Sequence, residues 1–193
     1  MSVGGGTVTE ALRRAAFFDV DETLINVTSI FSFLRYDMAV RGRPAADFRR
    51  AMDELAELRA AGASRVETNR AFYRNFAGRD VREVARRGRE WFNRCRAEGG
   101  LFNEEVLATL RWHSAEGHLI VLVSGSFPAC LEPIADFVSA DLVLCSRPEI
   151  RDGRYTGELA EPMIGERKRQ AVIRAAGERG IALDRSYAYG DNI

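Results

Sequence analysis

The chain has 193 residues, 46% of them hydrophobic, and its 28 acidic and 28 basic side chains give a formal net charge of zero at pH 7. This hydrophobic content is sufficient for a folded core and excludes wholesale disorder, and the length allows one large domain or one domain that carries an insertion. The balanced charge gives no global field that would attract nucleic acid or an anionic membrane, so neither is expected as a partner.

The sequence gives no sign of export or of membrane insertion. Residues 1–7 form a polar, glycine-rich tail without an apolar segment, and no stretch approaches the ~18 consecutive apolar residues of a membrane helix. Three cysteines (Cys95, Cys130 and Cys145) lie far apart and form no Cys-x-x-Cys pair. This argues against a disulfide framework or a zinc site, so a reducing, cytoplasmic location is expected. The oligomeric state is left open.

The most informative stretch is residues 15–24, AAFFDVDETL, in which four apolar residues run into an acidic cluster. The apolar run predicts a strand over Ala15–Val20 that is buried on both faces of a parallel sheet, with Asp19 and Asp21 at its carboxyl end, where such sheets place ligands. Two neighbouring aspartates repel each other unless a cation or a shared proton compensates. The alternatives are an acidic turn without function, or an aspartate that caps the next helix.

Residues 37–100 have a different character, because arginine, alanine and glutamate dominate and strand-like runs disappear. Residues 25–36 are expected to form a loop that leads into a helix. Apolar residues at helical spacing then predict a helix over 45–61, which Gly62 ends. A capping-box sequence starts a helix at Ser64 that is expected to run to Phe76, and a similar signal starts another at Asp80. We interpret this block as a small helical bundle inserted into an α/β fold.

Strands and helices alternate in the rest of the chain. Strands are predicted over 118–123, 140–145 and 186–189, helices over 103–116, 128–137 and 165–180, and a hairpin at the Asp-Gly turn of 152–153. The expected fold class is therefore α/β, with a Rossmann-like parallel sheet and an inserted helical cap. Trp91, Phe92 and Trp112 are expected to pack in the core. Because a strand that delivers an acidic residue should be followed by a helix and a further strand, the end at Ile193 predicts a truncated product or a fragment.

Two later positions add groups that suit an anion. Ser124 and Gly125 follow the second predicted strand and precede a helix, where a hydroxyl and backbone N–H groups can hold an anion, although serine is also an ordinary helix cap. Lys168 is the only lysine among the 28 basic residues. It stands in the first turn of its helix, where the dipole disfavours a cation unless an anion lies nearby. The position therefore favours a compact ammonium, with chance as the alternative.

Four stretches follow one another along the chain: Asp19-Val20-Asp21-Glu22-Thr23, Ser124, Lys168 and Gly190-Asp191. In order and context they resemble the four motifs of the haloacid dehalogenase superfamily of phosphatases. The helical insert between the first two motifs is similar to that of the phosphoserine-phosphatase-like branch, subfamily IB. The resemblance covers nearly the whole chain and implies a core domain of residues 1–25 and 101–193 and a helical cap of residues 26–100.

The resemblance implies a phosphatase that hydrolyses a small phosphorylated metabolite through an aspartyl-phosphate intermediate. Asp19 would be the nucleophile, and Asp21 would be the general acid and then the general base. Mg²⁺ would be held by the Asp19 side chain, the Asp21 backbone carbonyl and Asp191. Transfer of the phosphoryl group to an acceptor other than water, and a non-catalytic truncated fragment, are the alternatives.

The phosphoryl oxygens would be bound by Ser124, the Gly125 N–H group and Lys168, which would also stabilise charge in the transition state. Thr23 would order the loop by hydrogen bonds. Phosphoserine-specific members carry a glutamate nine residues after the nucleophile, where this chain has Thr28, which argues against phosphoserine as the substrate.

Substrate choice is expected to lie in the cap and in residues 26–33. Some of the cap arginines would meet an anionic substrate, or all of them would pair with acidic residues on a solvated helix face. These arginines are Arg65, Arg70, Arg74 and Arg79.

Overall fold

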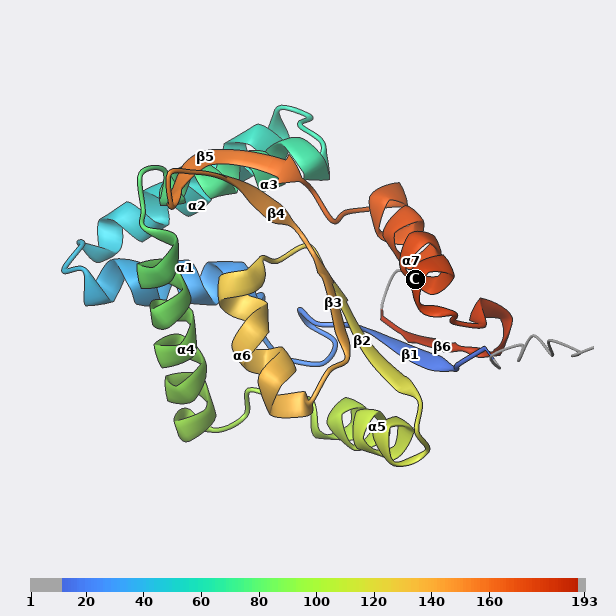
Figure 1. Cartoon of the computed structure of the whole chain (residues 1–193). Helices are drawn as coiled ribbons and strands as arrows, with labels where there is room; N and C mark the ends of the chain where they lie inside the picture. The colour runs from blue at the N-terminus through green and yellow to red at the C-terminus, as the bar shows by residue number, and fades with distance from the viewer. Residues whose placement is uncertain (1–11, 191–193) are drawn as a thin grey trace, which may run out of the picture.

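The computed structural model describes residues 12–190, and its centre is a four-stranded sheet in the order β3-β2-β1-β6 (Figure 1). Each neighbouring pair of strands is parallel. The strands are β1 (Ala15–Asp19), β2 (Leu119–Ser124), β3 (Leu142–Cys145) and β6 (Tyr187–Tyr189). The α/β class with a parallel sheet and inserted helices is therefore confirmed.

The predicted helices form with small shifts at their ends. The capping box at Ser64 is present, but the helix that follows it ends at Tyr73 and a 3-10 turn continues to Phe76. No helix among residues 12–190 is long and apolar enough to cross a membrane. The helices are α1 (Ser29–Val40), α2 (Ala45–Ala60), α3 (Arg65–Tyr73), η1 (Arg74–Phe76), α4 (Val81–Glu98), α5 (Glu104–Ala115), α6 (Pro128–Val138), α7 (Glu166–Arg179) and η2 (Leu183–Arg185).

Different helices cover the two faces of the sheet (Figure 1). On β1, Ala16 and Phe18 belong to a hydrophobic cluster that includes α6, whereas Ala15 and Phe17 belong to a second cluster that includes Ala176 of α7. Because successive side chains of a strand point to opposite faces, a strand covered on both sides needs an apolar residue at every position. The apolar run before Asp19 meets this requirement.

Two of the helices between β1 and α5, α1 and α4, pack directly on α6, which covers one face of the sheet. The hydrophobic cluster that contains Phe18 extends through α1, α3 and α4. Helix α4 crosses α6 at Gly88, so closely that a Cβ atom there would lie 1.8 Å from the carbonyl oxygen of Ala129. The division into a core of residues 1–25 and 101–193 and a cap of residues 26–100 stays a prediction, and the two parts share one hydrophobic cluster.

A β-hairpin of β4 (Arg147–Arg151) and β5 (Arg154–Glu161) makes a second connection to these helices. The Gly78 N–H group donates to the Tyr155 carbonyl at 2.8 Å, and the Tyr155 N–H group donates to the Arg79 carbonyl at 2.9 Å. The segment between α3 and α4 is therefore attached to the hairpin by backbone hydrogen bonds.

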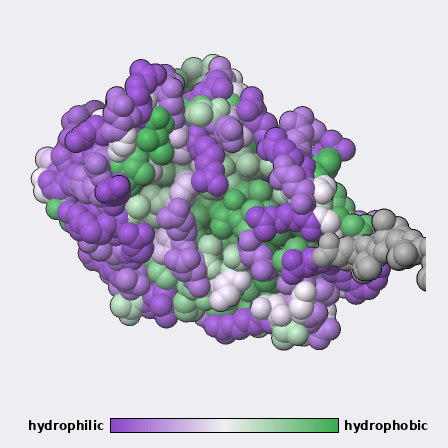
Figure 2. All heavy atoms as spheres, in the orientation of Figure 1, coloured by the Kyte–Doolittle hydropathy of each residue, from purple (hydrophilic) through white to green (hydrophobic). Residues whose placement is uncertain are grey.

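Trp91 and Phe92 are buried as expected, but Trp112 is 51% exposed, so its predicted place in the core is wrong. Trp112 lies on α5, whose buried residues are Leu107, Leu110 and His113, and its ring packs beside the ring of His113 at 4.6 Å between centroids. On the face of the molecule seen in Figure 2, hydrophobic residues gather at the centre and hydrophilic residues surround them.

The crossing of α4 and α6 gives a stability prediction. Gly88→Ala should lower the free energy of unfolding by about 1–2 kcal/mol, because the added methyl group forces the two helices apart and this overpacking, near the upper end of about 1–3 kcal/mol, exceeds the ~1 kcal/mol that alanine gains in a helix. The matched control is Gly177→Ala in α7, where an added Cβ meets no atom within 4 Å. It should leave stability unchanged or raise it. Urea unfolding measures both, and equal stability of the two variants would contradict the close crossing.

Candidate active site

The loop after β1 folds into a tight turn that presents two carboxylates. The Val20 carbonyl accepts hydrogen bonds from the N–H groups of Thr23 at 3.3 Å and Ile25 at 3.0 Å. Glu22 lies in the left-handed region with φ of 60°, a conformation that costs a non-glycine residue about 1 kcal/mol or more. The hydroxyl of Thr28 donates to the Glu22 carboxylate at 2.8 Å, which helps to hold this turn.

The carboxylate of Asp21 lies at the beginning of the next helix. Its Oδ1 atom accepts a hydrogen bond from the backbone N–H of Ser29, the first residue of α1, at 2.8 Å. The helix N-terminus favours a negative charge at this place. Asp21 therefore accepts a hydrogen bond at the start of α1, although the N-cap residue of that helix is Thr28. The same carboxylate lines the cavity described below, so this hydrogen bond does not exclude a role in ligand binding.

Asp19 forms an ion pair with the single lysine of the chain. Lys168 Nζ lies 3.0 Å from Asp19 Oδ1, and both side chains are partly exposed. Lys168 stands in the first turn of α7, where the helix dipole disfavours a positive charge. The Asp19 carboxylate supplies the anion that the sequence argument required for a lysine at this position.

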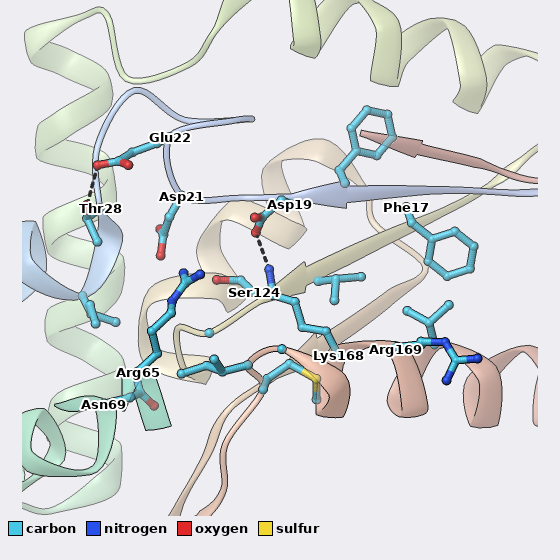
Figure 3. A pocket seen from close by; sticks show the side chains of 18 of the residues that line it. Phe17, Asp19, Asp21, Glu22, Thr28, Arg65, Asn69, Ser124, Lys168 and Arg169 are labelled. Atoms are coloured by element: carbon cyan, nitrogen blue, oxygen red, sulfur yellow. Dashed lines mark hydrogen bonds and ion pairs between the residues drawn. The ribbon is translucent and has the colours of Figure 1, made fainter. Parts of the chain in front are cut away.

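Ser124 ends β2 and turns its side chain toward the same region (Figure 3). The residue is buried, and its Oγ atom accepts a hydrogen bond from the backbone N–H of Ser126 at 3.0 Å. Gly125 follows in the loop that leads to α6 at Pro128. The carboxyl ends of β1 and β2 thus bring a carboxylate and a hydroxyl together, as parallel neighbours do.

One cavity of about 1020 Å³ receives five of the predicted site residues: Asp19, Asp21, Ser124, Gly125 and Lys168. Thr23 is not among its lining residues, and its backbone takes part in the turn after β1. Asp191, the third predicted metal ligand, lies outside the described residues. The structure therefore brings together every predicted site residue that it describes, except for Thr23.

The other wall of the cavity comes from the inserted helices and combines apolar and polar groups. Ile30, Phe31 and Phe72 supply apolar surface, while Arg65 and Asn69 extend from α3 (Figure 3). The Asn69 Oδ1 atom is buried and has no hydrogen-bond partner among the described residues. The sequence did not single out Asn69, because an asparagine within an amphipathic helix carries no distinguishing pattern.

The four cap arginines, for which the sequence left open contact with a substrate or pairing with acidic residues, have different surroundings in the structure. Arg65 lines the cavity and forms no ion pair with a described residue. Arg79 instead pairs with the fully buried carboxylate of Asp37 at 2.8 Å and with Glu83 at 3.1 Å. Arg70 and Arg74 are exposed and do not line the cavity. Pairing of all four arginines on a solvated helix face is therefore wrong, and contact of Arg65 with an anionic substrate stays a prediction.

The surroundings of Asp21 raise its pKa to about 6 from an ordinary value of 3.8. Burial is the largest cause, and the nearby charge of Asp19 acts in the same direction. Hydrogen bonds from Ser29 and the charge of Lys168 oppose the shift. A carboxyl group with this pKa holds or releases a proton close to neutral pH, which suits a general acid or base.

The oxygen donors of the site fit a hard divalent cation. Asp19 and Asp21 place two carboxylates at one sheet edge, and Mg²⁺ binds through one or two carboxylates, water and phosphate oxygens. Within residues 12–190 no group of three or more His, Cys, Asp or Glu side chains is arranged to hold a metal ion. The donor chemistry fits Mg²⁺, with Asp191 as the further predicted ligand.

Comparisons with known proteins agree on one family. A family model described as haloacid dehalogenase-like hydrolase matches residues 16–193. A probable phosphatase of Mycobacterium tuberculosis is 31% identical over 192 residues, which are 98% of this chain and 66% of that protein. A Streptomyces azureus protein named for inhibition of morphological differentiation is 31% identical over 186 residues, 93% of this chain and 66% of its own length. The chain thus spans about two thirds of these relatives.

Solved structures show the same fold. A protein of unknown function from Bordetella pertussis Tohama I has a TM-score of 0.80 at 27% identity, covering 92% of this chain and 82% of its own. A substrate-bound phosphoserine phosphatase has a TM-score of 0.64 at 18% identity, covering 93% of this chain and 78% of its own. At that identity the second similarity describes the fold alone.

The raised pKa of Asp21 predicts that this residue lowers the free energy of unfolding at neutral pH. Because the folded protein holds the Asp21 proton up to about pH 6 and an unfolded chain releases it near 3.8, the free energy of unfolding falls as pH rises between these values. In the presence of a chelator, Asp21→Asn should therefore raise this free energy at pH 7.5 by up to about 3 kcal/mol and should change it little at pH 4.

Urea unfolding of both proteins at the two pH values measures this difference. Asp53→Asn, a change at an exposed aspartate on α2, is the matched control and should follow the wild type at both pH values. An equal difference between Asp21→Asn and wild type at pH 4 and pH 7.5 would contradict the assigned pKa shift.

Proposed function

Because this chain belongs to the haloacid dehalogenase-like hydrolase family, we propose that it is a phosphatase that hydrolyses a small phosphomonoester, with Asp19 as the nucleophile. The observation that carries the proposal is the placement of Lys168 Nζ 3.0 Å from Asp19 Oδ1, in a cavity that Asp21 and Ser124 also line. Phosphoryl transfer through an acyl phosphate needs a carboxylate nucleophile, a second carboxyl group for proton transfer, and a cation and a hydroxyl to bind the phosphoryl group.

In the first step, a carboxylate oxygen of Asp19 attacks phosphorus and the bond from phosphorus to the alcohol oxygen breaks. Lys168, Ser124 Oγ and the Gly125 N–H group bind the phosphoryl oxygens, where negative charge accumulates in the transition state. Asp21 donates its proton to the departing alcohol oxygen. Its raised pKa means that a fraction of the protein carries this proton near neutral pH.

In the second step, water attacks the phosphorus of the aspartyl phosphate and releases inorganic phosphate. Asp21, now a carboxylate, accepts the proton of that water, and the Asp19 carboxylate is restored. When bound by the Asp19 side chain, the Asp21 backbone carbonyl and Asp191, Mg²⁺ would neutralise negative charge on the phosphoryl oxygens.

The alcohol portion of the substrate occupies the wall formed by the inserted helices. Phe31 and Phe72 offer apolar contact, and Arg65 offers a positive charge that no described carboxylate neutralises. The buried Asn69 Oδ1 can accept a hydrogen bond from the substrate. We therefore infer a phosphomonoester whose alcohol carries a second anionic group. Phosphoserine itself is not favoured, since Thr28 stands where its specific phosphatases carry a glutamate.

Removal of the nucleophile tests the reaction type. Asp19→Asn should lower hydrolysis of p-nitrophenyl phosphate in the presence of Mg²⁺ by at least ~10³-fold, because an amide cannot form the acyl phosphate. Release of nitrophenol measures the rate, and Asp53→Asn should keep the wild-type rate. Persistent turnover by Asp19→Asn would mean that another residue is the nucleophile.

Competition tests the inferred second anion. Phosphoglycerate carries a carboxylate that glycerol phosphate lacks, so Arg65→Gln should weaken inhibition of p-nitrophenyl phosphate hydrolysis by phosphoglycerate ~10-fold and should change inhibition by glycerol phosphate by less than ~2-fold. Arg70→Gln, on the same helix but outside the cavity, is the control. Equal effects of Arg65→Gln on both inhibitors would contradict the role of Arg65.

A further inference from the structure

Two fully buried serine hydroxyls lie behind the cavity. Ser29 and Ser126 are each 0% exposed. Their Oγ atoms are 2.8 Å apart and form a hydrogen bond between residues that are 97 positions apart in the sequence. Ser29 is the first residue of α1, and Ser126 lies in the loop between β2 and α6.

Each of these serines also bonds to a residue of the proposed reaction. The Ser29 N–H group donates to Asp21 Oδ1 at 2.8 Å. The Ser126 N–H group donates to Ser124 Oγ at 3.0 Å. The hydroxyl pair therefore joins the element that holds the Asp21 carboxyl to the loop that presents Ser124.

We propose that the Ser29–Ser126 hydroxyl pair positions the Asp21 carboxyl for proton transfer to the leaving alcohol. Ser29 holds Oδ1, so the second carboxyl oxygen of Asp21 is the one left to face the alcohol oxygen. This inference rests on the proposed phosphatase function, and it assigns Ser29 and Ser126 as positioning residues that do not touch the substrate.

The physical basis is the cost of a buried hydroxyl without a partner, about 1–3 kcal/mol. Separating the two hydroxyls breaks a fully buried hydrogen bond, so the pair favours one distance between the start of α1 and the loop after β2. Proton transfer needs a heavy-atom separation of about 2.6–3.2 Å, and a displacement of about 1 Å can lower a rate ~10²-fold.

The effect depends on the leaving group. In the first step the bond from Asp19 to phosphorus forms, the bond from phosphorus to the ester oxygen breaks, and the electron pair left on that oxygen takes the proton of Asp21. Phenolate is a strong base and needs this proton, whereas nitrophenolate is a weaker base and leaves with little assistance. Phenyl phosphate and p-nitrophenyl phosphate therefore form a nearly size-matched pair that reports on Asp21.

The test compares kcat/KM for these two esters in the purified protein with Mg²⁺, because this constant reports the first step alone. Ser29→Ala and Ser126→Ala keep both backbone N–H donors and remove only the hydroxyls. Each should raise the ratio of kcat/KM for p-nitrophenyl phosphate to that for phenyl phosphate ~10-fold. The double variant should raise it no further than Ser29→Ala alone, since the Ser126 hydroxyl acts on Asp21 only through Ser29.

Two controls separate positioning from general loosening. Ser146 is also fully buried, and its N–H group donates to the Ser126 carbonyl at 2.8 Å, but it has no bond to Asp21. Ser146→Ala should keep the wild-type ratio. In an Asp21→Asn background, Ser29→Ala should no longer change the ratio, because the proton donor is already absent.

The outcomes distinguish failure of the positioning role from failure of the proposed phosphatase function. An unchanged ratio in Ser29→Ala and Ser126→Ala, with wild-type turnover of both esters, overturns the positioning role and leaves the phosphatase function standing. A ratio that still rises in the Asp21→Asn background also overturns it. If the wild-type protein with Mg²⁺ hydrolyses neither ester, the proposed function itself fails.

Discussion

The structure depends on how a buried parallel strand ends in two carboxylates. β1 is flanked by β2 and β6 and is covered on both faces, so Asp19 and Asp21 leave the sheet close together with limited access to water. Their charges repel and both would resist burial, unless the surroundings compensate. Lys168 compensates Asp19 by an ion pair, and for Asp21 the N-terminus of α1 and a raised pKa have this role. The fold therefore supplies one carboxylate held in an ion pair and one carboxyl whose raised pKa lets it exchange a proton near neutral pH.

The inserted helices contribute directly to this arrangement. α1 begins at the Asp21 carboxylate, α4 is fixed to α6 at Gly88, and α3 adds Arg65 and Asn69 to the cavity wall. Because one hydrophobic cluster runs through these helices and the sheet, the position of the acid and the shape of the pocket for the alcohol depend on the same packing.

The sequence predicted the features that depend on neighbouring residues in the chain, namely the secondary-structure elements and the motif residues. Alternating runs gave the strands and helices, Ser64 and Asp80 gave helix starts, and the motif order placed Asp19, Ser124 and Lys168 at one rim. It could not predict features that tertiary packing decides. The exposure of Trp112, the contact of Gly88 with Ala129 and the meeting of Ser29 with Ser126 all join segments whose own patterns are ordinary. Asn69 was missed for the same reason, since only the fold shows that its oxygen lacks a partner.

The central claim is that Asp19 becomes phosphorylated during turnover, and chemical trapping tests it most directly. The protein is mixed with p-nitrophenyl phosphate and Mg²⁺ and quenched in acid, and borohydride then reduces any acyl phosphate to an alcohol before peptide mass spectrometry. The account predicts a reduced side chain at residue 19 that is absent when substrate is omitted and absent in Asp19→Asn. A reduced carboxylate elsewhere, a phosphate on Ser124, or turnover that leaves residue 19 unaltered would contradict it.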